Sequence, residues 1–283
     1  MNFSFYTGFH TKLKEAGIDA AARYAREHGF SGVEFYCDAV ARVSAIPDVK
    51  TAREVKQGLD ANDLSMSCVS VAYDAIACPD AESTMRPYCE IAQALGSPFL
   101  HHTLLIKPVA TDGDAETRNK LLRAADAAVA IAHMAEAYGL TCLYEDQGRY
   151  VNGVKNFVFF YEAVKCRASN VGVCFDTGNI LYVNEMPEDF LRAFLAEVKH
   201  VHIKDHLLAR EAPTDKTGWR KSLGDIFYRD AMPCDGSLAL GTCLDMLRHA
   251  KYTGSFALEL YDPFPRKEAL SHAMARLSAH WED

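Results

Sequence analysis

The chain has 283 residues, of which 49% are hydrophobic and 24% charged, and its formal net charge is −8. A chain of this length and composition buries most of its apolar surface on folding, so it needs neither disulfides nor a structural metal for stability. An acidic surface repels phosphate backbones, which argues against nucleic acid as the main partner. The first residues, MNFSFYTGFH, lack a basic segment followed by an apolar stretch, and no run of about 18 uncharged apolar residues is present, so neither a signal peptide nor a membrane span is expected.

The nine cysteines are an odd number and include no CxxC pair. Scattered free thiols are typical of a reducing compartment, so we expect a cytoplasmic protein without disulfides. Cys142 and Cys174 lie inside apolar runs and are expected to be buried.

Short β-rich runs alternate with longer amphipathic runs along the whole chain. The expected strands cover residues 2–6, 31–36, 64–71, 98–103, 140–145, 171–176, 198–204 and 255–261. Between them apolar residues recur at spacings of three and four, as in residues 117–138, which predicts outer helices. Gly29, Gly139 and Gly254 stand just before strands and are expected to end helices in a left-handed conformation.

This alternation predicts a single (β/α)8 TIM barrel over residues 1–283, because each crossover returns the chain to the same end of a parallel sheet. An open doubly wound sheet is the alternative, but no GxGxxG motif follows the first strand and no P-loop is present. Residues 206–239 form an unusually long connection, rich in basic residues and containing Trp219. Long loops in compact domains are usually functional, so we interpret this segment as a lid over the barrel mouth, with an irregular surface excursion as the alternative.

Ionisable residues stand at the ends of the last four expected strands, where a parallel barrel gathers its catalytic groups. They are Glu145, Asp176, His202 and Glu259. Three carboxylates at close quarters need a compensating cation, and oxygen ligands with one imidazole suit manganese, magnesium, cobalt or zinc. His200 points the same way as His202 in a strand, and we prefer His202 because it lies nearer the C-terminal end. Separate salt bridges at the barrel rim are the alternative.

The chain resembles the xylose-isomerase-like barrels, especially their sugar and cyclitol isomerase and epimerase branch. The resemblance is carried by the segments LYEDQG (143–148), GVCFDTGN (172–179), VKHVHIKD (198–205) and YTGSFALELY (252–261). It extends from GFSGVEFY (29–36) to the last strand. In that family the four motif positions hold the metal, which implies one divalent ion on Glu145, Asp176, His202 and Glu259.

The resemblance implies an isomerase or epimerase that removes a proton next to the carbonyl of a small sugar or cyclitol and passes through a metal-stabilised enediolate. Glu145 and Glu259 are the expected catalytic pair, one removing the proton and the other returning it. Glu34, at the end of the second expected strand, is a weaker carboxylate candidate for the site, and a rim ion pair is the favoured interpretation. The candidates for substrate binding are His102, Gln147, Asn179, Lys204 and Arg210.

Two positions depart from the ketose 3-epimerases, which often carry a histidine at the position of Asn179 and a glutamate at that of Val151. The chain looks closer to inosose isomerases and inosose dehydratases. A dehydratase, which removes the same proton and then expels a hydroxyl group, is therefore the runner-up. A phosphodiesterase similar to endonuclease IV would need further histidine ligands, for which His101 and His102 are available, and a non-catalytic sugar-binding barrel would not need the complete set of four ligands. The sequence leaves open whether the substrate is phosphorylated and whether the chain forms a homo-oligomer.

Overall fold

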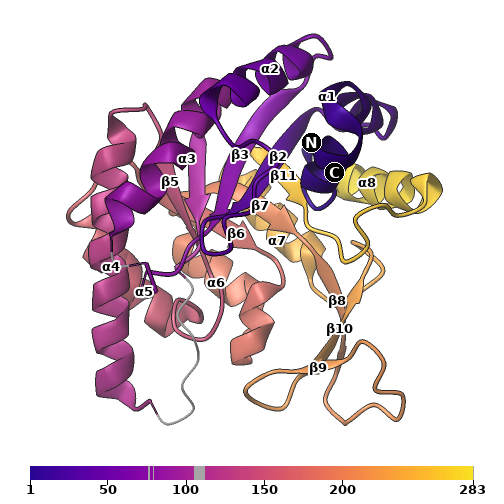
Figure 1. The fold of residues 1–283 in the computed structure, drawn as a ribbon. Helices are drawn as coiled ribbons and strands as arrows, with labels where there is room; N and C mark the ends of the chain where they lie inside the picture. Colours follow the sequence, from indigo (N-terminus) through magenta and orange to yellow (C-terminus); the bar gives the residue numbers. More distant parts are fainter. Residues whose placement is uncertain (76, 79, 105–111, 283) are drawn as a thin grey trace.

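The computed structural model describes residues 1–75, 77–78, 80–104 and 112–282. Eight parallel strands form a closed barrel in the order β1-β11-β7-β6-β5-β4-β3-β2 (Figure 1). They are β1 (Asn2–Phe5), β2 (Gly32–Asp38), β3 (Ser65–Ala72), β4 (Phe99–His102), β5 (Thr141–Glu145), β6 (Val171–Asp176), β7 (Val198–Ile203) and β11 (Ser255–Leu258). Because β1 pairs in parallel with both β2 and β11, the sheet closes on itself. The predicted TIM barrel is confirmed, and the open doubly wound sheet is excluded.

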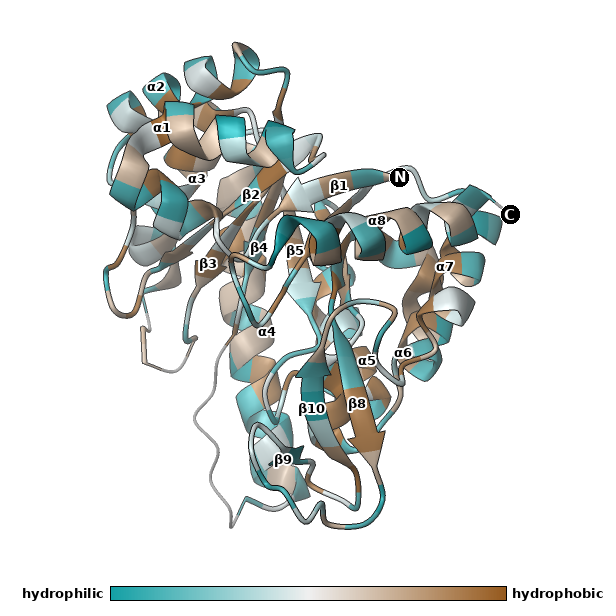
Figure 2. Cartoon of the chain, turned by 90° about the vertical axis from the view of Figure 1, so that its right-hand side faces the viewer, coloured by the Kyte–Doolittle hydropathy of each residue, from teal (hydrophilic) through white to brown (hydrophobic). Residues whose placement is uncertain are grey.

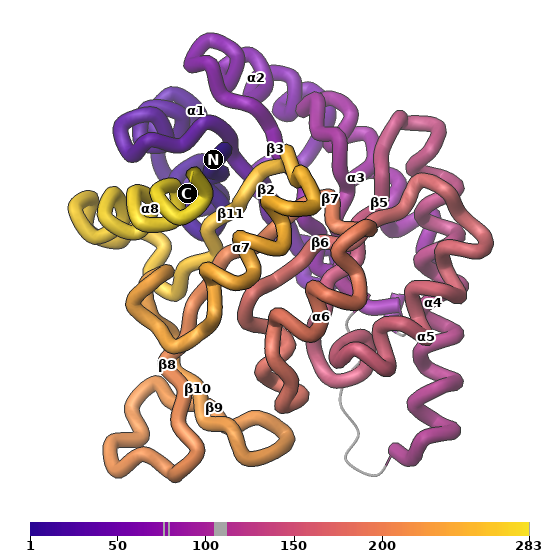
Figure 3. Tube along the Cα trace, turned by 180° about the vertical axis from the view of Figure 1, so that it is seen from behind, coloured from indigo at the N-terminus to yellow at the C-terminus, as the bar shows by residue number. Residues whose placement is uncertain are grey.

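Helices follow the barrel strands in turn and surround them, as the view from behind shows (Figure 3). They are α1 (Phe9–Glu27), α2 (Val49–Asp60), α3 (Ala81–Leu95), α4 (Asp114–Glu136), α5 (Val154–Lys165), α6 (Pro187–Phe194), α7 (Leu240–His249) and α8 (Lys267–Glu282). Two short 3-10 helices, η1 (Asn179–Val183) and η2 (Leu195–Glu197), flank α6. Apolar strands lie inside this ring, and hydrophilic residues gather on the outer helix faces (Figure 2). Among the described residues, no helix has both the length and the apolar run needed to cross a bilayer.

Local sequence signals account for several helix ends. Asp48 accepts a hydrogen bond from the backbone N–H of Thr51 at 2.8 Å and so caps α2 at its N-terminus. Gly29 and Gly139 have φ angles of 84° and 70°, which confirms the left-handed conformation expected after α1 and α4. The expectation was wrong for the end of α7, where Lys251 takes the left-handed conformation with a φ of 58° and Gly254 does not.

Alternate side chains along each strand point into the barrel. Cys68, Leu143 and Cys174 form a buried apolar group with Phe99 packed against it, and this group lies apart from the main core outside the strands. Because strand side chains repeat with period two, Leu143 predicts the inward direction of Glu145, and Cys174 that of Asp176. All nine cysteines are free, and Cys142 and Cys174 are buried as expected.

The long connection after β7 is folded. It contains β8 (Asp205–Ala209), β9 (Arg220–Lys221) and β10 (Phe227–Ala231), which form an antiparallel sheet in the order β8-β10-β9. This sheet, which we call the hairpin extension (residues 205–231), projects away from the barrel (Figures 1 and 2). Its strands are paired with one another, and its role as a lid over the barrel mouth stays a prediction.

Candidate active site

The four predicted ligands lie together at one end of the barrel. Glu145 and Asp176 are the last residues of β5 and β6, His202 is in β7, and Glu259 directly follows β11. Each offers one ligand atom, and these four atoms all lie within 4.8 Å of one another. Nδ1 of His202 is 2.9 Å from Oε1 of Glu145 and 3.3 Å from Oε2 of Glu259.

Strand register and tight turns bring these side chains to one level. Asp176 pairs with His202 across β6 and β7, and Ala257 pairs with His202 across β7 and β11. Oδ1 of Asp176 accepts hydrogen bonds from the backbone N–H groups of Gly178 and Asn179, each at 2.7 Å. These bonds fix one carboxylate oxygen, while Oδ2 of Asp176 has no hydrogen bond among the described residues and faces the amine of Lys204.

Lys204 supplies positive charge to the cluster. Its Nζ lies 3.0 Å from Oδ2 of Asp176 and 2.8 Å from Oε1 of Glu259. Burial alone would lower the pKa of Lys204, but the carboxylates of Asp176 and Glu259 raise it, so the amine stays charged. Burial raises the pKa of Asp176 to about 7 despite Lys204. For Glu259, Lys204 and His202 outweigh burial and hold the pKa below its usual range.

Three groups of donor atoms around His202 are close enough to hold a cation. The group with Glu34 and His200 and the group with Glu145 and Cys174 are wholly buried, and burial raises the pKa of the Cys174 thiol, which keeps it protonated. The group with Glu145, Asp176 and Glu259 opens to solvent, since the Glu259 side chain is 31% exposed. Three carboxylates and one imidazole are a donor set suited to a hard or borderline divalent ion. The residues present therefore fit a metal at the open group.

A cavity of about 380 Å³ lies beside this cluster and shares Glu259 with it. Its inner wall includes Glu259, Lys204 and Asn179. The hairpin extension provides its outer wall, with His206, Arg220, Tyr228 and Asp230. Arg220 donates to Asp230 at 2.5 Å, and Nδ1 of His206 lies 3.2 Å from the same carboxylate oxygen. The cavity has the size of a small-molecule site and is lined by groups that bind hydroxyls.

Two of the five predicted substrate-binding residues line the cavity, and the other three do not. Lys204 and Asn179 line the cavity, and Nζ of Lys204 donates to Oδ1 of Asn179 at 3.0 Å. Gln147 is half-buried beside Glu145 but does not line the cavity. His102 is buried with its ring edge-on to Tyr144, outside the barrel interior. Arg210 is exposed and pairs with Asp225 at 2.9 Å, away from the cavity.

Several residues at the site were missed from the sequence. His101, and not His102, points inward, because it lies two residues after Phe99, which packs against the interior group. Glu34 lies within β2 at 0% exposure and pairs with His200 and His202, so the expected ion pair is present but lies in the barrel interior and not at its rim. Leu143 points inward like Glu145, because the two are two residues apart in one strand. His101 pairs with Leu143 in the neighbouring strand, so it points inward as well. Counting in steps of two along both strands would therefore have identified His101.

Two further residues had no signal in the sequence. The ring of Tyr6, just after β1, stacks on His202 with centroids 4.9 Å apart. Asp146 is fully buried beside Asp176, and burial followed by the charge of Asp176 raises its pKa well above the usual value. Both positions depend on side-chain packing across strands, which a single sequence does not encode in its spacing.

Comparison with known structures supports the fold. A protein described as the IOLI protein with a bound zinc atom is 15% identical, with a TM-score of 0.72 over 100% of this chain and 98% of that one. D-allulose 3-epimerase from Methylomonas sp. is 15% identical, with a TM-score of 0.72 over 99% and 98% of the two chains. The probable 3-DHS dehydratase AsbF of petrobactin synthesis from Bacillus anthracis is also 15% identical, with a TM-score of 0.71 over 98% and 99%. At this level of identity the likeness shows the fold alone.

Comparison of the sequence with curated proteins gave no match. The model of one protein family, described as the xylose isomerase-like TIM barrel, matches residues 22–280. That match spans most of the chain and includes β2 to β11 with all four clustered ligands. The chain therefore belongs to the xylose isomerase-like TIM barrel family.

Proposed function

We propose that this protein is a divalent-metal-dependent isomerase or epimerase of a small sugar or cyclitol. The observation that carries the proposal is the convergence of Glu145, Asp176, His202 and Glu259 on one another, with Glu259 also lining a cavity of about 380 Å³. The zinc atom of the IOLI protein and the activity named for D-allulose 3-epimerase support it by analogy of fold.

The four residues would hold one ion, whether manganese, magnesium, cobalt or zinc. When bound, the ion acts as a Lewis acid that favours negative charge on the oxygens of an α-hydroxy ketone. Lys204 donates toward the same region from between Asp176 and Glu259, so it adds a fixed positive charge where an oxyanion would develop.

Glu145 and Glu259 are the proposed proton carriers. Glu259 is ionised at neutral pH because its pKa is held low, and its partial exposure places it on the cavity wall. It is therefore suited to remove a proton from the substrate carbon. Glu145 is buried and bonds His202 through Oε1, while its Oε2 lies beside His101. Return of the proton to the same carbon gives epimerisation, and return to the neighbouring carbon gives isomerisation.

A dehydratase remains the second candidate. It would use the same proton removal and then expel a β-hydroxyl group. The structural similarity to the probable 3-DHS dehydratase AsbF favours keeping this alternative. Only the product distinguishes the two reactions.

The phosphodiesterase alternative is less well supported by the described residues. A site similar to that of endonuclease IV needs several histidines at the open end of the barrel. Here His102 lies against Tyr144 outside the barrel, and Nε2 of His200 is bonded to Glu34. Among the described residues, His202 is the one histidine of the open ligand group, and Nε2 of His101, 3.6 Å from Oε2 of Glu145, is a second candidate nitrogen.

Solvent exchange tests the proposal. Protein loaded with Mn²⁺ is incubated in deuterated water with a panel of ketoses and inososes, the ion is then removed with a chelator, and NMR follows deuterium at the α-carbons. We expect exchange with one or more panel members, and loss of exchange by at least about a hundredfold in Glu259→Gln, because general-base removal typically costs 10²–10⁴. Glu211→Gln, on the exposed surface of the hairpin extension, is the matched control and should exchange normally. Full exchange in Glu259→Gln would overturn its assignment, and product formation without deuterium incorporation would overturn the mechanism.

A further inference from the structure

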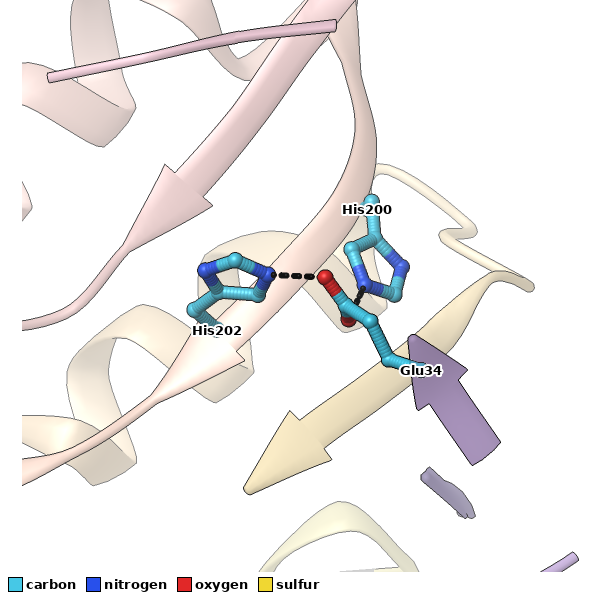
Figure 4. A group of neighbouring side chains, drawn as sticks. All are labelled: Glu34, His200 and His202. Atoms are coloured by element: carbon cyan, nitrogen blue, oxygen red, sulfur yellow. Dashed lines mark hydrogen bonds and ion pairs between the residues drawn. The ribbon is translucent and has the colours of Figure 1, made fainter. Parts of the chain in front are cut away.

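Glu34 is a carboxylate buried beneath the proposed metal site. It is 0% exposed and lies within β2, not at its end. Its two oxygens face two histidines of β7, as Figure 4 shows. Oε1 lies 3.0 Å from Nε2 of His202, and Oε2 lies 2.7 Å from Nε2 of His200.

An ionised carboxylate only accepts hydrogen bonds, so both Nε2 atoms must carry a proton. For His202, this leaves Nδ1 as the atom that faces Glu145 and Glu259. For His200, the bond to Glu34 occupies Nε2 and holds the ring below the ligand cluster. The pairing therefore decides which histidine of β7 is presented to the ion and through which nitrogen.

Ser70 connects Glu34 to a third histidine, His101. The Ser70 hydroxyl lies 2.5 Å from Oε1 of Glu34, to which it must donate its single proton. Its oxygen lies 2.9 Å from Nδ1 of His101 and therefore accepts from that nitrogen. Nε2 of His101 is 3.6 Å from Oε2 of Glu145, too far for a hydrogen bond, and has no partner among the described residues. A neutral His101 thus presents an unprotonated Nε2 to the site.

We propose that Glu34 is a positioning residue that fixes the proton positions of three histidines: it directs Nδ1 of His202 at the metal, withholds His200 from it, and through Ser70 leaves Nε2 of His101 as an acceptor beside Glu145. The proposal rests on the proposed metal site. A separate ion on Glu34 and His200 is the competing interpretation, but it would have to displace both N–H donors from a carboxylate that already accepts from three groups. Partners that orient metal-bound histidines typically change metal affinity 10–100-fold when removed.

The proton positions are measured directly by long-range ¹H–¹⁵N NMR on Zn²⁺-loaded protein with ¹⁵N-labelled histidine. Replacements of His101, His200 and His202 assign the signals. We expect Nε2–H in His202 and His200, a zinc-shifted Nδ1 in His202, and Nδ1–H in His101. Zinc on Nε2 of His202, or Nε2–H in His101, would overturn the proposal.

Metal affinity provides the second measurement. Glu34→Gln keeps the shape of the side chain but offers an amide donor to one histidine, so Mn²⁺ affinity should fall about 10–100-fold. If Glu34→Gln does not fold, Ser70→Ala carries the test, because it should release His101 from the Nδ1–H form. Its matched control is Ser67→Ala on the same strand, whose hydroxyl bonds the backbone carbonyl of Val33 at 2.9 Å, and this variant should leave His101 unchanged.

Failure of the proposed function and failure of the role of Glu34 would give different results. Wild-type protein that binds neither Mn²⁺ nor Zn²⁺ would refute the proposed function, whereas the proton positions of His101 and His200 could still be measured. Wild-type protein that binds one ion, together with unchanged affinity in folded Glu34→Gln, would refute the role of Glu34 alone. A second ion lost specifically in Glu34→Gln would establish the competing interpretation.

Discussion

Nζ of Lys204 lies 2.8 Å from Oε1 of Glu259, so a charged amine contacts one of the proposed metal ligands directly. The same amine contacts Asp176 at 3.0 Å. Lys204 therefore partly neutralises the carboxylates that would otherwise attract a cation. We therefore expect Lys204 to have opposite effects on metal binding and on catalysis.

This double role predicts that Lys204→Met binds Mn²⁺ more tightly, on the order of tenfold or about 1.4 kcal/mol, because a repelling charge is removed. Turnover should nevertheless fall by about a hundredfold, since the positive charge that stabilises an oxyanion is lost. Titration calorimetry and the exchange assay measure the two effects. Lys199→Met, which changes an exposed lysine of β7, should change neither. Weaker metal binding in Lys204→Met would show that the lysine helps to assemble the site instead.

The pH dependence of metal binding follows from Asp176 and His202. Burial raises the pKa of Asp176 to about 7. Burial alone would lower the pKa of His202, but Cys174 and Glu34 raise it well above the usual value. Both groups therefore hold protons in the metal-free protein that an ion must displace.

A raised pKa in the folded state gives stability that is lost as pH rises from the unfolded pKa through the folded one. Asp176 therefore weakens the metal-free protein from about pH 4 to about pH 7, and His202 does so from about pH 6.5 upward. Bound metal removes this loss. We expect the rise in Tm caused by Mn²⁺ to grow from about pH 6 to about pH 8 and proton release to accompany binding. Titrating groups away from the site affect the Tm of the loaded and the metal-free sample alike, so their contributions cancel in the difference between the two Tm values. A rise in Tm that shrinks toward pH 8 would contradict the assignment.

Asp205 anchors the hairpin extension to the barrel. Its two oxygens accept four backbone N–H groups, those of His206, Cys234, Gly236 and Leu238. Asp205→Ala would leave these buried donors unpaired, and each costs about 1–3 kcal/mol when it stays unsatisfied. We expect faster hydrogen exchange in residues 205–238 and a loss of about 3 kcal/mol or more in unfolding free energy. Asp215→Ala, which removes an exposed carboxylate that accepts a hydrogen bond from the N–H of Thr217, should cost under about 1 kcal/mol.

Much of the fold was predictable because strand and helix periods and the order of elements are local properties of the sequence. Glu145, Asp176 and Glu259 were found because a carboxylate at the end of an apolar strand is conspicuous. Glu34 and His101 were misjudged or overlooked because their roles depend on which face of a strand they occupy. The hairpin extension was expected as a loop, since its strands pair across an insertion whose register no local pattern specifies.

The hairpin extension predicts where selectivity resides. Arg220 and His206 both contact Asp230 on the outer cavity wall, away from the ligand cluster. Asp230→Asn should raise KM about tenfold for a substrate found in the exchange assay, with kcat changed less than about threefold, because a lost distal hydrogen bond weakens binding in ground and transition states alike. Asp225→Asn, an exposed carboxylate in the same extension, is the control. A large fall in kcat alone would place Asp230 in the chemistry and not in recognition.

The number of ions per chain tests the central claim most directly. Metal-free protein is dialysed against Mn²⁺ and its bound metal is counted by elemental analysis, alongside Asp176→Asn and His202→Gln. We expect one ion per chain in wild-type protein. Both variants should lose metal affinity by at least about a hundredfold, since each removes one of the four ligands. Two or more ions per chain, or full binding in both variants, would contradict a single site on Glu145, Asp176, His202 and Glu259.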